Sequence, residues 1–308
     1  MPLMNALPRY NRPHETAAPV PISPSDALIP FAAAEAAIAT SALSEGGRNL
    51  ALGLLRLGCI KAFAGGGVGI EYGGLLKTAA RPEYLAAHVA EAAAHLRERR
   101  IDLLLVPGMS GYPVGAMYSV VSGIPAVLLK KNKLDPGAPN ALAYPEGAFV
   151  IPSYTGEGEV VISADLDAVQ EIVDGIVAPQ LAAQTATAAP VLTLRAAGAD
   201  DIIDKATMSQ AVSDSALVVG RAAIADFIRR HREATGDPRP IDARVDVVAW
   251  VTPIIKGYND PHAHLWRTFG LRPFAGINVT GVQLDPPALG IEGLGIIAFR
   301  TDEVGKRR

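Results

Sequence analysis

The chain has 308 residues, of which 49% are hydrophobic and 19% charged, and its net charge is −3. That composition allows one large or two modest domains, and it predicts no basic surface for nucleic acid. The single cysteine, Cys59, excludes an internal disulfide and suits a reducing compartment. No apolar run reaches transmembrane length and the first residues lack the apolar core of a signal peptide, so we expect a soluble, cytoplasmic protein with no membrane partner.

The N-terminal part predicts an arm followed by helices. Prolines recur from Pro2 to Pro24 and indicate an extended arm that packs on the body of the protein or on a partner subunit. We expect helices over residues 27–44 and 46–59, followed by a glycine-rich stretch at 63–74. That stretch has no Gly-Lys-Ser/Thr and no clear strand before it, which argues against a Walker loop and a dinucleotide fingerprint. It is either a flexible loop or a backbone that lies close to a ligand.

The next stretch predicts a unit of two parallel strands joined by a helix. The expected elements are a helix at 82–100, a strand at 101–106, a turn at 107–113, a helix at 114–122 and a strand at 126–129. The first strand is continuously apolar, as in a sheet buried on both faces, and the turn lies at its carboxyl end, where such sheets bind ligands. Lys130, Lys131 and Lys133 follow the second strand and would either neutralise a diphosphate or form a solvated basic turn. We expect His88 and His95, on the first helix, to be packed or exposed rather than ligands.

An acidic pair further along gives the starting point for function. Asp200 and Asp201 follow a short predicted strand and precede a helix predicted over residues 209–232. Thr207 and Gln210 have the spacing of a capping box at the start of that helix. Free amides there favour an anion, and two carboxylates could hold hydroxyl groups or a hydrated Mg²⁺ beside it. A sugar phosphate needs this combination, although a plain capped loop would give the same pattern.

Residues 200–204, Asp-Asp-Ile-Ile-Asp, resemble the phosphoribosyl-diphosphate (PRPP) motif of type I phosphoribosyltransferases. In that family a strand is followed by two acidic residues and a turn that grips the 5′-phosphate. The turn at 205–208 is about one residue shorter than the family's and lacks its usual glycine. Residues 58–168 are similar in order and spacing to adenine phosphoribosyltransferases, with Ser110 where an arginine is usual. With the acidic motif included, the resemblance spans residues 60–250.

The resemblance implies an α/β fold, a mostly parallel twisted sheet flanked by helices, with an appended C-terminal subdomain. It implies an N-terminal arm and helix at 1–44, a phosphoribosyltransferase-like domain at 45–255 with an insertion at about 165–190, and an extension at 256–308. The activity implied is Mg²⁺-dependent transfer of the phosphoribosyl group from PRPP to a nucleobase, a purine such as adenine, with release of diphosphate. The family also implies a homodimer.

Roles for individual residues follow from the same resemblance. The diphosphate would be held by Gly108, Ser110, Gly111, Lys130, Lys131 and Lys133. The ribose hydroxyls, and Mg²⁺ through water, would be held by Asp200 and Asp201, both lying in a cleft where neither supports the core. The 5′-phosphate would be bound by Lys205, Ala206, Thr207 and Ser209. The base would contact Val68, Ile70 and Tyr72, and its proton would be handled by Glu157, Glu159 or Asp204.

Several alternatives stay open. The acidic pair of the motif could instead be Asp165 and Asp167. The chain could be a non-catalytic ligand-binding or regulatory protein on the same fold, because fold does not fix function. Beyond a strand expected at 245–251, the tail predicts strands at 274–284 and 290–299. It faintly resembles the end of the RidA imine-deaminase family, with Gly276 in place of that family's arginine. His262 and His264 would be a metal pair only with a third ligand.

Overall fold

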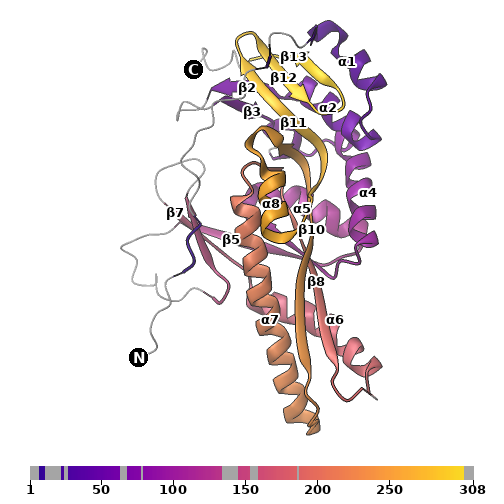
Figure 1. Cartoon of the computed structure of the whole chain (residues 1–308), viewed down its shortest axis with the longest axis vertical. Coiled ribbons are helices and arrows are strands. Elements are labelled where there is room, and N and C mark those ends of the chain that lie inside the picture. Colours follow the sequence, from indigo (N-terminus) through magenta and orange to yellow (C-terminus); the bar gives the residue numbers. More distant parts are fainter. Residues whose placement is uncertain are drawn as a thin grey trace. The chain divides into compact units, whose positions relative to one another are not determined.

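The computed structural model describes residues 7–10, 22–23, 27–62, 68–77, 79–133, 145–152, 159–185 and 187–301. The chain divides into two compact units, each assembled from separate stretches (Figure 1). The first unit comprises Met1–Arg12, Leu96–Ala199 and Thr207–Trp250, and the second comprises Pro13–His95, Asp200–Ala206 and Val251–Arg308. The chain therefore passes between the units several times. The domain division expected from the sequence stays a prediction.

The first unit is built on a sheet with strand order β8-β4-β5-β7-β6. Its strands are β4 (Leu103–Pro107), β5 (Ala126–Lys133), β6 (Phe149–Pro152), β7 (Glu159–Ser163) and β8 (Val191–Ala199). β4 pairs in parallel with β5 on one side and with β8 on the other. β7 runs antiparallel to β5 and to β6. The parallel pairing predicted from the two apolar runs is confirmed, and so is the α/β fold class.

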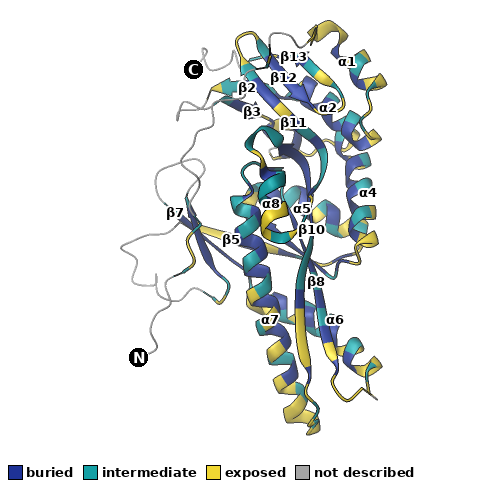
Figure 2. Cartoon of the chain, viewed as in Figure 1, coloured by how far each residue is buried: buried dark blue, intermediate teal, exposed yellow. Residues whose placement is uncertain are grey.

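Three helices accompany this sheet. They are α5 (Gly108–Ser122), α6 (Leu166–Ala183) and α7 (Thr207–Thr235). α6 buries Val169, Val173, Val177 and Leu181, one residue per turn, and this stripe packs the helix against α7 and β8. All five residues of β4 are buried, as expected of a parallel strand covered on both faces. Figure 2 shows exposure rising toward the last turns of α7 and the first residues of β10 (Asp242–Lys256).

The second unit combines helices with a second run of strands. Its helices are α1 (Phe31–Thr40), α2 (Glu45–Leu57), α3 (Gly73–Leu76), α4 (Pro82–Glu98, up to His95), the 3-10 turn η1 (Gly257–Asn259) and α8 (Pro261–Phe269). Its strands are β1 (Leu28–Ile29), β2 (Cys59–Ala62), β3 (Val68–Glu71), β9 (Ile202–Ile203), the end of β10, β11 (Phe274–Leu284), β12 (Pro287–Ile291) and β13 (Gly295–Ala298). β10 is parallel to β9 and β11, and β11, β12 and β13 follow as antiparallel neighbours, with β1 parallel to β13. β2 and β3 form a separate antiparallel hairpin.

Several expected boundaries were wrong. The strand expected at 290–299 is two strands, because Glu292 to Leu294 turn the chain between β12 and β13. A strand, β2, does precede the glycine-rich stretch, but it continues into a hairpin with β3 rather than into a helix. α5 begins at Gly108, so most of the turn expected at 107–113 is helical. Residues 63–67 of the glycine-rich stretch lie outside the described residues.

The N-terminal segment 7–10 lies beside β6 in the first unit, where Arg9 and Val150 form an isolated parallel bridge. The Val150 amide donates to the Pro8 carbonyl at 2.9 Å, and the Tyr10 amide donates to the Val150 carbonyl at 3.0 Å. The Tyr10 hydroxyl donates to Asp214 of α7 at 2.9 Å, and Arg9 pairs with Glu159. Burial, followed by the contact with Asp214, raises the pKa of Tyr10 well above its usual range. For these residues, the arm expected to pack on the body of the protein does so.

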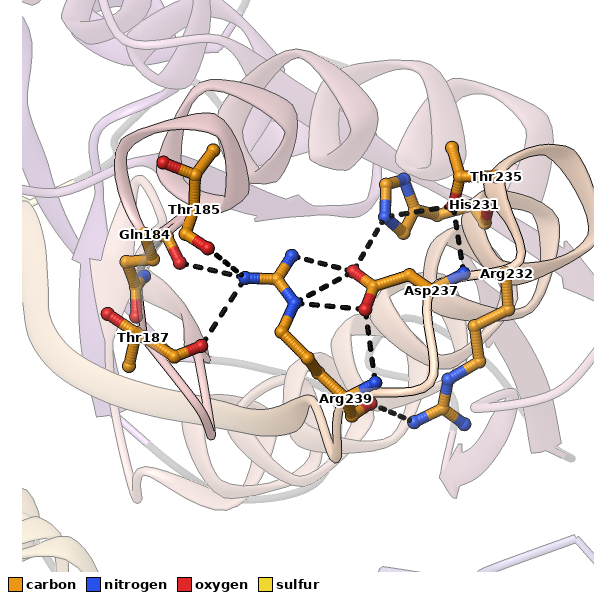
Figure 3. A network of polar contacts seen from close by, with 8 residues as sticks. All are labelled: Gln184, Thr185, Thr187, His231, Arg232, Thr235, Asp237 and Arg239. Carbon is orange, nitrogen blue, oxygen red and sulfur yellow. Dashed lines mark hydrogen bonds and ion pairs between the residues drawn. The ribbon is translucent and has the colours of Figure 1, made fainter.

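A polar network ties the end of α7 to the connection between α6 and β8 (Figure 3). The Arg239 guanidinium donates to both oxygens of Asp237, and its Nη1 donates to the carbonyls of Gln184, Thr185 and Thr187 at 2.9, 3.0 and 3.3 Å. His231 lies 3.2 Å from Asp237. The Arg239 guanidinium thus binds one carboxylate and three backbone carbonyls at once. Among the helices of the described residues, none has the length and apolar character that crossing a bilayer requires.

Candidate functional site

The start of α5 provides the anion-binding features expected of a diphosphate loop. α5 follows β4 without a loop, so the amides of Gly108, Met109 and Ser110 are the first of the helix and have no carbonyl partner within it. Gly108 adopts φ +25°, which an L-residue reaches only under strain. A Cβ there would stand 3.4 Å from Cβ and Cδ of Lys131, so the lysine stem lies against the helix start. Ser110 is half-buried in the same turn. A helix start beside a lysine favours a bound anion.

Lys130 and Lys131 do not both face the start of α5, and the role of Lys133 stays a prediction. They lie in β5, which extends to Lys133 because it pairs with β7, rather than in a turn. Side chains alternate across a strand, so Lys130 and Lys131 point to opposite faces. Lys130 pairs with Asp165 at 2.8 Å, and Asp165 also caps α6 by accepting from the Ala168 amide. Lys130 is therefore engaged away from Gly108. In the alternative acidic pair, Asp165 and Asp167, Asp165 has a structural role because it caps the start of α6.

Asp201 is not the open cleft carboxylate that the sequence suggested. Its side chain is 2% exposed. Its Oδ2 accepts the Tyr72 hydroxyl at 2.9 Å and lies 3.3 Å from the Lys77 ammonium, which also stands 4.7 Å from the centre of the Tyr72 ring. A buried carboxylate with a cation and a hydroxyl donor supports the unit that contains it. The expectation that it plays no part in stability was wrong.

Asp200 is placed differently. The residue is half-buried, its Oδ1 accepts from the Asp201 amide at 2.9 Å, and its own amide donates to the Val251 carbonyl at 3.2 Å. Burial, the Asp201 charge and a hydrogen bond between the two carboxyl groups raise the pKa of Asp200 well above its usual range, opposed by Lys77. The pair thus keeps a proton to higher pH than an isolated aspartate would.

The residues expected to contact a base lie in and after the β2–β3 hairpin. Val68 is half-buried and Ile70 is buried in β3. Tyr72 was expected to contact the base, but the residue is 6% exposed and its hydroxyl is bonded to Asp201. A ring covered in this way offers no open face for a base, which corrects that assignment. The roles of Val68 and Ile70 stay predictions.

The turn after the acidic pair carries the groups expected to bind the 5′-phosphate. Ala206 adopts the left-handed conformation at φ +59°, which glycine reaches most easily. Lys205 and Thr207 are half-buried, and α7 begins at Thr207 itself rather than after it. Ser209 is buried, and its carbonyl accepts the hydroxyl of Ser213 at 2.8 Å. The first amides of α7 are free of intrahelical partners, as an anion site requires.

The candidates for handling the base proton are engaged in ion pairs wherever the structure describes them. Glu159, at the start of β7, is paired with Arg9. Asp204 lies 3.0 Å from the Lys256 ammonium and also accepts from the Asn259 amide group. Glu157 lies outside the described residues. Neither described carboxylate is an unpaired base as it stands.

Sequence reasoning missed the partners of these residues. Arg9, Lys77, Lys256 and Asn259 carry no motif, and each meets its partner only because the chain folds back. His88 is buried against Phe274, as expected of a packed residue. His262 and His264 lie on α8, and the described residues contain no group of three or more potential metal ligands.

The similar proteins found for this chain are solved structures. No protein-family model and no curated protein sequence matches this chain. Among solved structures, the chain is similar to an adenine phosphoribosyltransferase from Giardia lamblia complexed with 9-deazaadenine, with 12% identity, a TM-score of 0.40 and coverage of 72% of this chain and 94% of that one. It is similar to the enzyme from Rhodothermus marinus with 14% identity, a TM-score of 0.41 and coverage of 76% and 98%. It is also similar to the Saccharomyces cerevisiae enzyme complexed with an imino-altritol bisphosphate and adenine, with 11% identity, a TM-score of 0.41 and coverage of 75% and 98%. These structures are of the family that the motifs of the sequence resemble.

Proposed function

We propose that the protein is a phosphoribosyltransferase that moves the phosphoribosyl group of PRPP to a nucleobase, a purine such as adenine. The observation that carries the proposal is the pairing of β4 with β8. The two strands are parallel neighbours, with Leu105 opposite Gly198, so their carboxyl ends lie at the same edge of the sheet. The helix start at Gly108 follows one strand and the acidic pair follows the other. That edge is where parallel sheets bind ligands.

In the proposed reaction a base nitrogen forms the new bond to the anomeric carbon, the bond to the diphosphate oxygen breaks, and the proton of that nitrogen passes to Glu157, Glu159 or Asp204. Negative charge grows on the leaving diphosphate, and donors fixed in advance stabilise it. The first amides of α5 and the ammonium of Lys131 have that role. The first amides of α7, with Lys205 and Thr207, hold the 5′-phosphate. Asp200 accepts hydrogen bonds from the ribose hydroxyls.

At this site Mg²⁺ would be bound mainly by oxygen atoms of the substrate, with a carboxylate of the protein as a further ligand. In phosphate sites Mg²⁺ keeps several waters and binds one or two carboxylates together with substrate oxygens. Asp200 suits that role. Asp201 does not, because its Oδ2 already faces the Lys77 ammonium at 3.3 Å. When bound, the ion would neutralise charge on the diphosphate.

A second candidate is a ligand-binding or regulatory protein that takes PRPP or a nucleotide without turnover. The ion pairs of Glu159 with Arg9 and of Asp204 with Lys256 favour this candidate, because a general base must be free to accept a proton. Ser110, in place of an arginine, removes a charge that would stabilise the leaving group. Binding without release of diphosphate would distinguish this candidate from the enzyme.

We also propose a homodimer. α5 contains no charged residue, and Met109 and Val120 on it are 76% and 82% exposed. Exposed apolar side chains grouped on one helix are typical of an interface, and a two-fold dimer is the commonest assembly of identical chains. Light scattering at micromolar concentration should report about twice 32.1 kDa. A species of 32.1 kDa alone would exclude the dimer at that concentration.

The test of the activity is a PRPP-dependent diphosphate-release assay with Mg²⁺ across a panel of nucleobases, accompanied by calorimetric titration of PRPP. The enzyme proposal expects release with at least one base. Lys131→Ala should weaken PRPP binding by roughly ten- to a hundredfold, because a hydrogen bond to a charged group is lost. Lys130→Ala is the matched control, since it removes the neighbouring lysine on the opposite face of β5, and it should change binding less than threefold. Equal effects of the two substitutions would count against the site, and absence of PRPP binding would exclude the proposal.

A further inference from the structure

The two acidic residues of the proposed PRPP site have unequal surroundings. Asp201 is 2% exposed, and its Oδ2 receives both the Tyr72 hydroxyl and the Lys77 ammonium. A ribose hydroxyl that donated to this oxygen would have to displace one of them. One oxygen of this buried carboxylate, Oδ2, is therefore satisfied from within the second unit.

Both donors come from the flanks of one short helix. Tyr72 stands at the N-cap of α3 and Lys77 at its C-cap, and the single turn between them brings both side chains to the same carboxylate oxygen. The turn is closed by bonds from the Leu76 amide to the Tyr72 carbonyl and from the Lys77 amide to the Gly73 carbonyl. The Lys77 ammonium also stands over the Tyr72 ring at 4.7 Å, so the two donors are fixed relative to each other.

Asp200 has a different set of contacts. Its Oδ1 accepts from the Asp201 amide at 2.9 Å, and its carboxyl group also shares a hydrogen bond with that of Asp201, while no ion pair joins it to a lysine, arginine or histidine of the described residues. Its backbone is held by the bond from its amide to Val251 of β10. Asp200 is thus fixed in position by main-chain bonds, and the residue as a whole is half-buried where Asp201 is buried.

We propose, on the basis of the proposed function, that Asp200 and Asp201 have different roles. Tyr72 and Lys77 are positioning residues. They hold Asp201 as the buried support of the turn, and Asp200 is the carboxylate that binds the ribose hydroxyls of PRPP. The substrate-binding role assigned equally to both residues by the sequence pattern then belongs to one of them.

The experiment compares five substitutions, Asp200→Asn, Asp201→Asn, Lys77→Met, Lys77→Arg and Tyr72→Phe, by thermal unfolding of the free protein and by calorimetric titration with PRPP and Mg²⁺. Asp200→Asn should weaken PRPP binding by about ten- to a hundredfold and leave Tm unchanged. Asp201→Asn should lower Tm because it removes a buried charge from its cation. Lys77→Met should lower Tm and weaken PRPP binding by roughly tenfold, since Asp200 loses its fixed neighbour, and Lys77→Arg should restore both, because the charge is kept.

Lys61→Met is the matched control, because it removes a lysine from β2 of the same unit without touching Asp201, and it should change neither quantity. Tyr72→Phe removes only one hydroxyl and keeps the comparison possible if Asp201→Asn does not fold. The proposal is overturned if Asp201→Asn loses PRPP binding at unchanged Tm, or if Asp200→Asn binds as the wild type does. If the wild type does not bind PRPP, the proposed function fails separately. In that case, the order of the Tm values of the variants still decides whether Tyr72 and Lys77 support Asp201.

Discussion

Gly198 lies against the indole of Trp250, so closely that a Cβ on Gly198 would stand 2.2 Å from Cζ2 of Trp250. Trp250 is fully buried, and its Nε1 donates to the Ser213 hydroxyl at 3.0 Å, so the ring cannot move aside without losing that bond. Glycine at 198 is required for packing, two residues before the acidic pair.

Gly198→Ala should therefore lower the free energy of unfolding by about 1–3 kcal/mol, as overpacked cores do. Urea denaturation followed by tryptophan fluorescence measures it. The control is Gly175→Ala in α6, where an added Cβ meets nothing within 4 Å. That substitution should raise stability by roughly 0.5–1 kcal/mol, because glycine in a helix is costly relative to alanine. A shift of the same sign in both variants would contradict this reading of the 198 contact.

Ala206 should tolerate glycine better than a buried alanine usually does. Its left-handed conformation, φ +59°, costs an L-residue about 1–2 kcal/mol. Glycine relieves that strain, which offsets the loss of a buried methyl group and the added freedom of the unfolded chain. Ala206→Gly should leave the free energy of unfolding within roughly 0.5 kcal/mol of the wild type. Ala211→Gly, at a fully buried position inside α7, should cost about 1 kcal/mol or more. Equal losses in the two variants would refute the strain argument.

His88 should make stability depend on pH in the weakly acidic range. Burial lowers the pKa of His88 from 6.5 to about 4. The unfolded chain takes up this proton near pH 6.5 and the folded chain only near pH 4, so protons favour unfolding between the two values. The contribution is fully present above pH 6.5 and about 3 kcal/mol is lost by pH 4.

Urea unfolding at half-unit pH steps compares the wild type with His88→Gln, which cannot titrate. The variant should have a lower stability at pH 7 and a flatter slope between pH 6.5 and 4. Parallel slopes in the two proteins would show that other groups cause the pH dependence.

Arg239 should be replaceable by neither lysine nor alanine. Its guanidinium contacts Asp237 and three backbone carbonyls at once, and a lysine ammonium has no comparable fork. Arg239→Lys should lower Tm, with increased amide exchange in residues 184–191. Arg232→Lys is the matched control, because Arg232 lies at the same end of α7 and makes one bond, to the Arg239 carbonyl at 2.9 Å. If the two substitutions lower Tm equally, the several contacts of Arg239 in the network of Figure 3 contribute no more than the bond of Arg232 to the Arg239 carbonyl.

The sequence correctly predicted the elements that depend on a pattern within one short segment, such as a run of apolar residues. The strand expected at 274–284 is β11 with the same bounds, and the parallel pairing of β4 with β5 followed from two apolar runs. The start of α5 was placed too late because glycine and proline normally interrupt a helix. Here Gly108 lies in the first turn, where amides lack a helical partner, and Pro113 lies inside the helix, which continues past it. The hydrogen-bond partners of the site residues could not be predicted from the sequence for a different reason. Tyr72 and Asp201 are 129 positions apart, and nothing in either segment indicates that a hydroxyl and a carboxylate will meet.

The segment 7–10 also bears on how the protein can be handled. β6 reads Phe-Val-Ile-Pro, and without the segment its Val150 amide and carbonyl would lose the bonds to Pro8 and Tyr10. An apolar strand with an open edge is a template for the strand of another molecule. Shortening the chain past residue 10 would therefore create an aggregation site, even though no residue of the proposed PRPP site is removed.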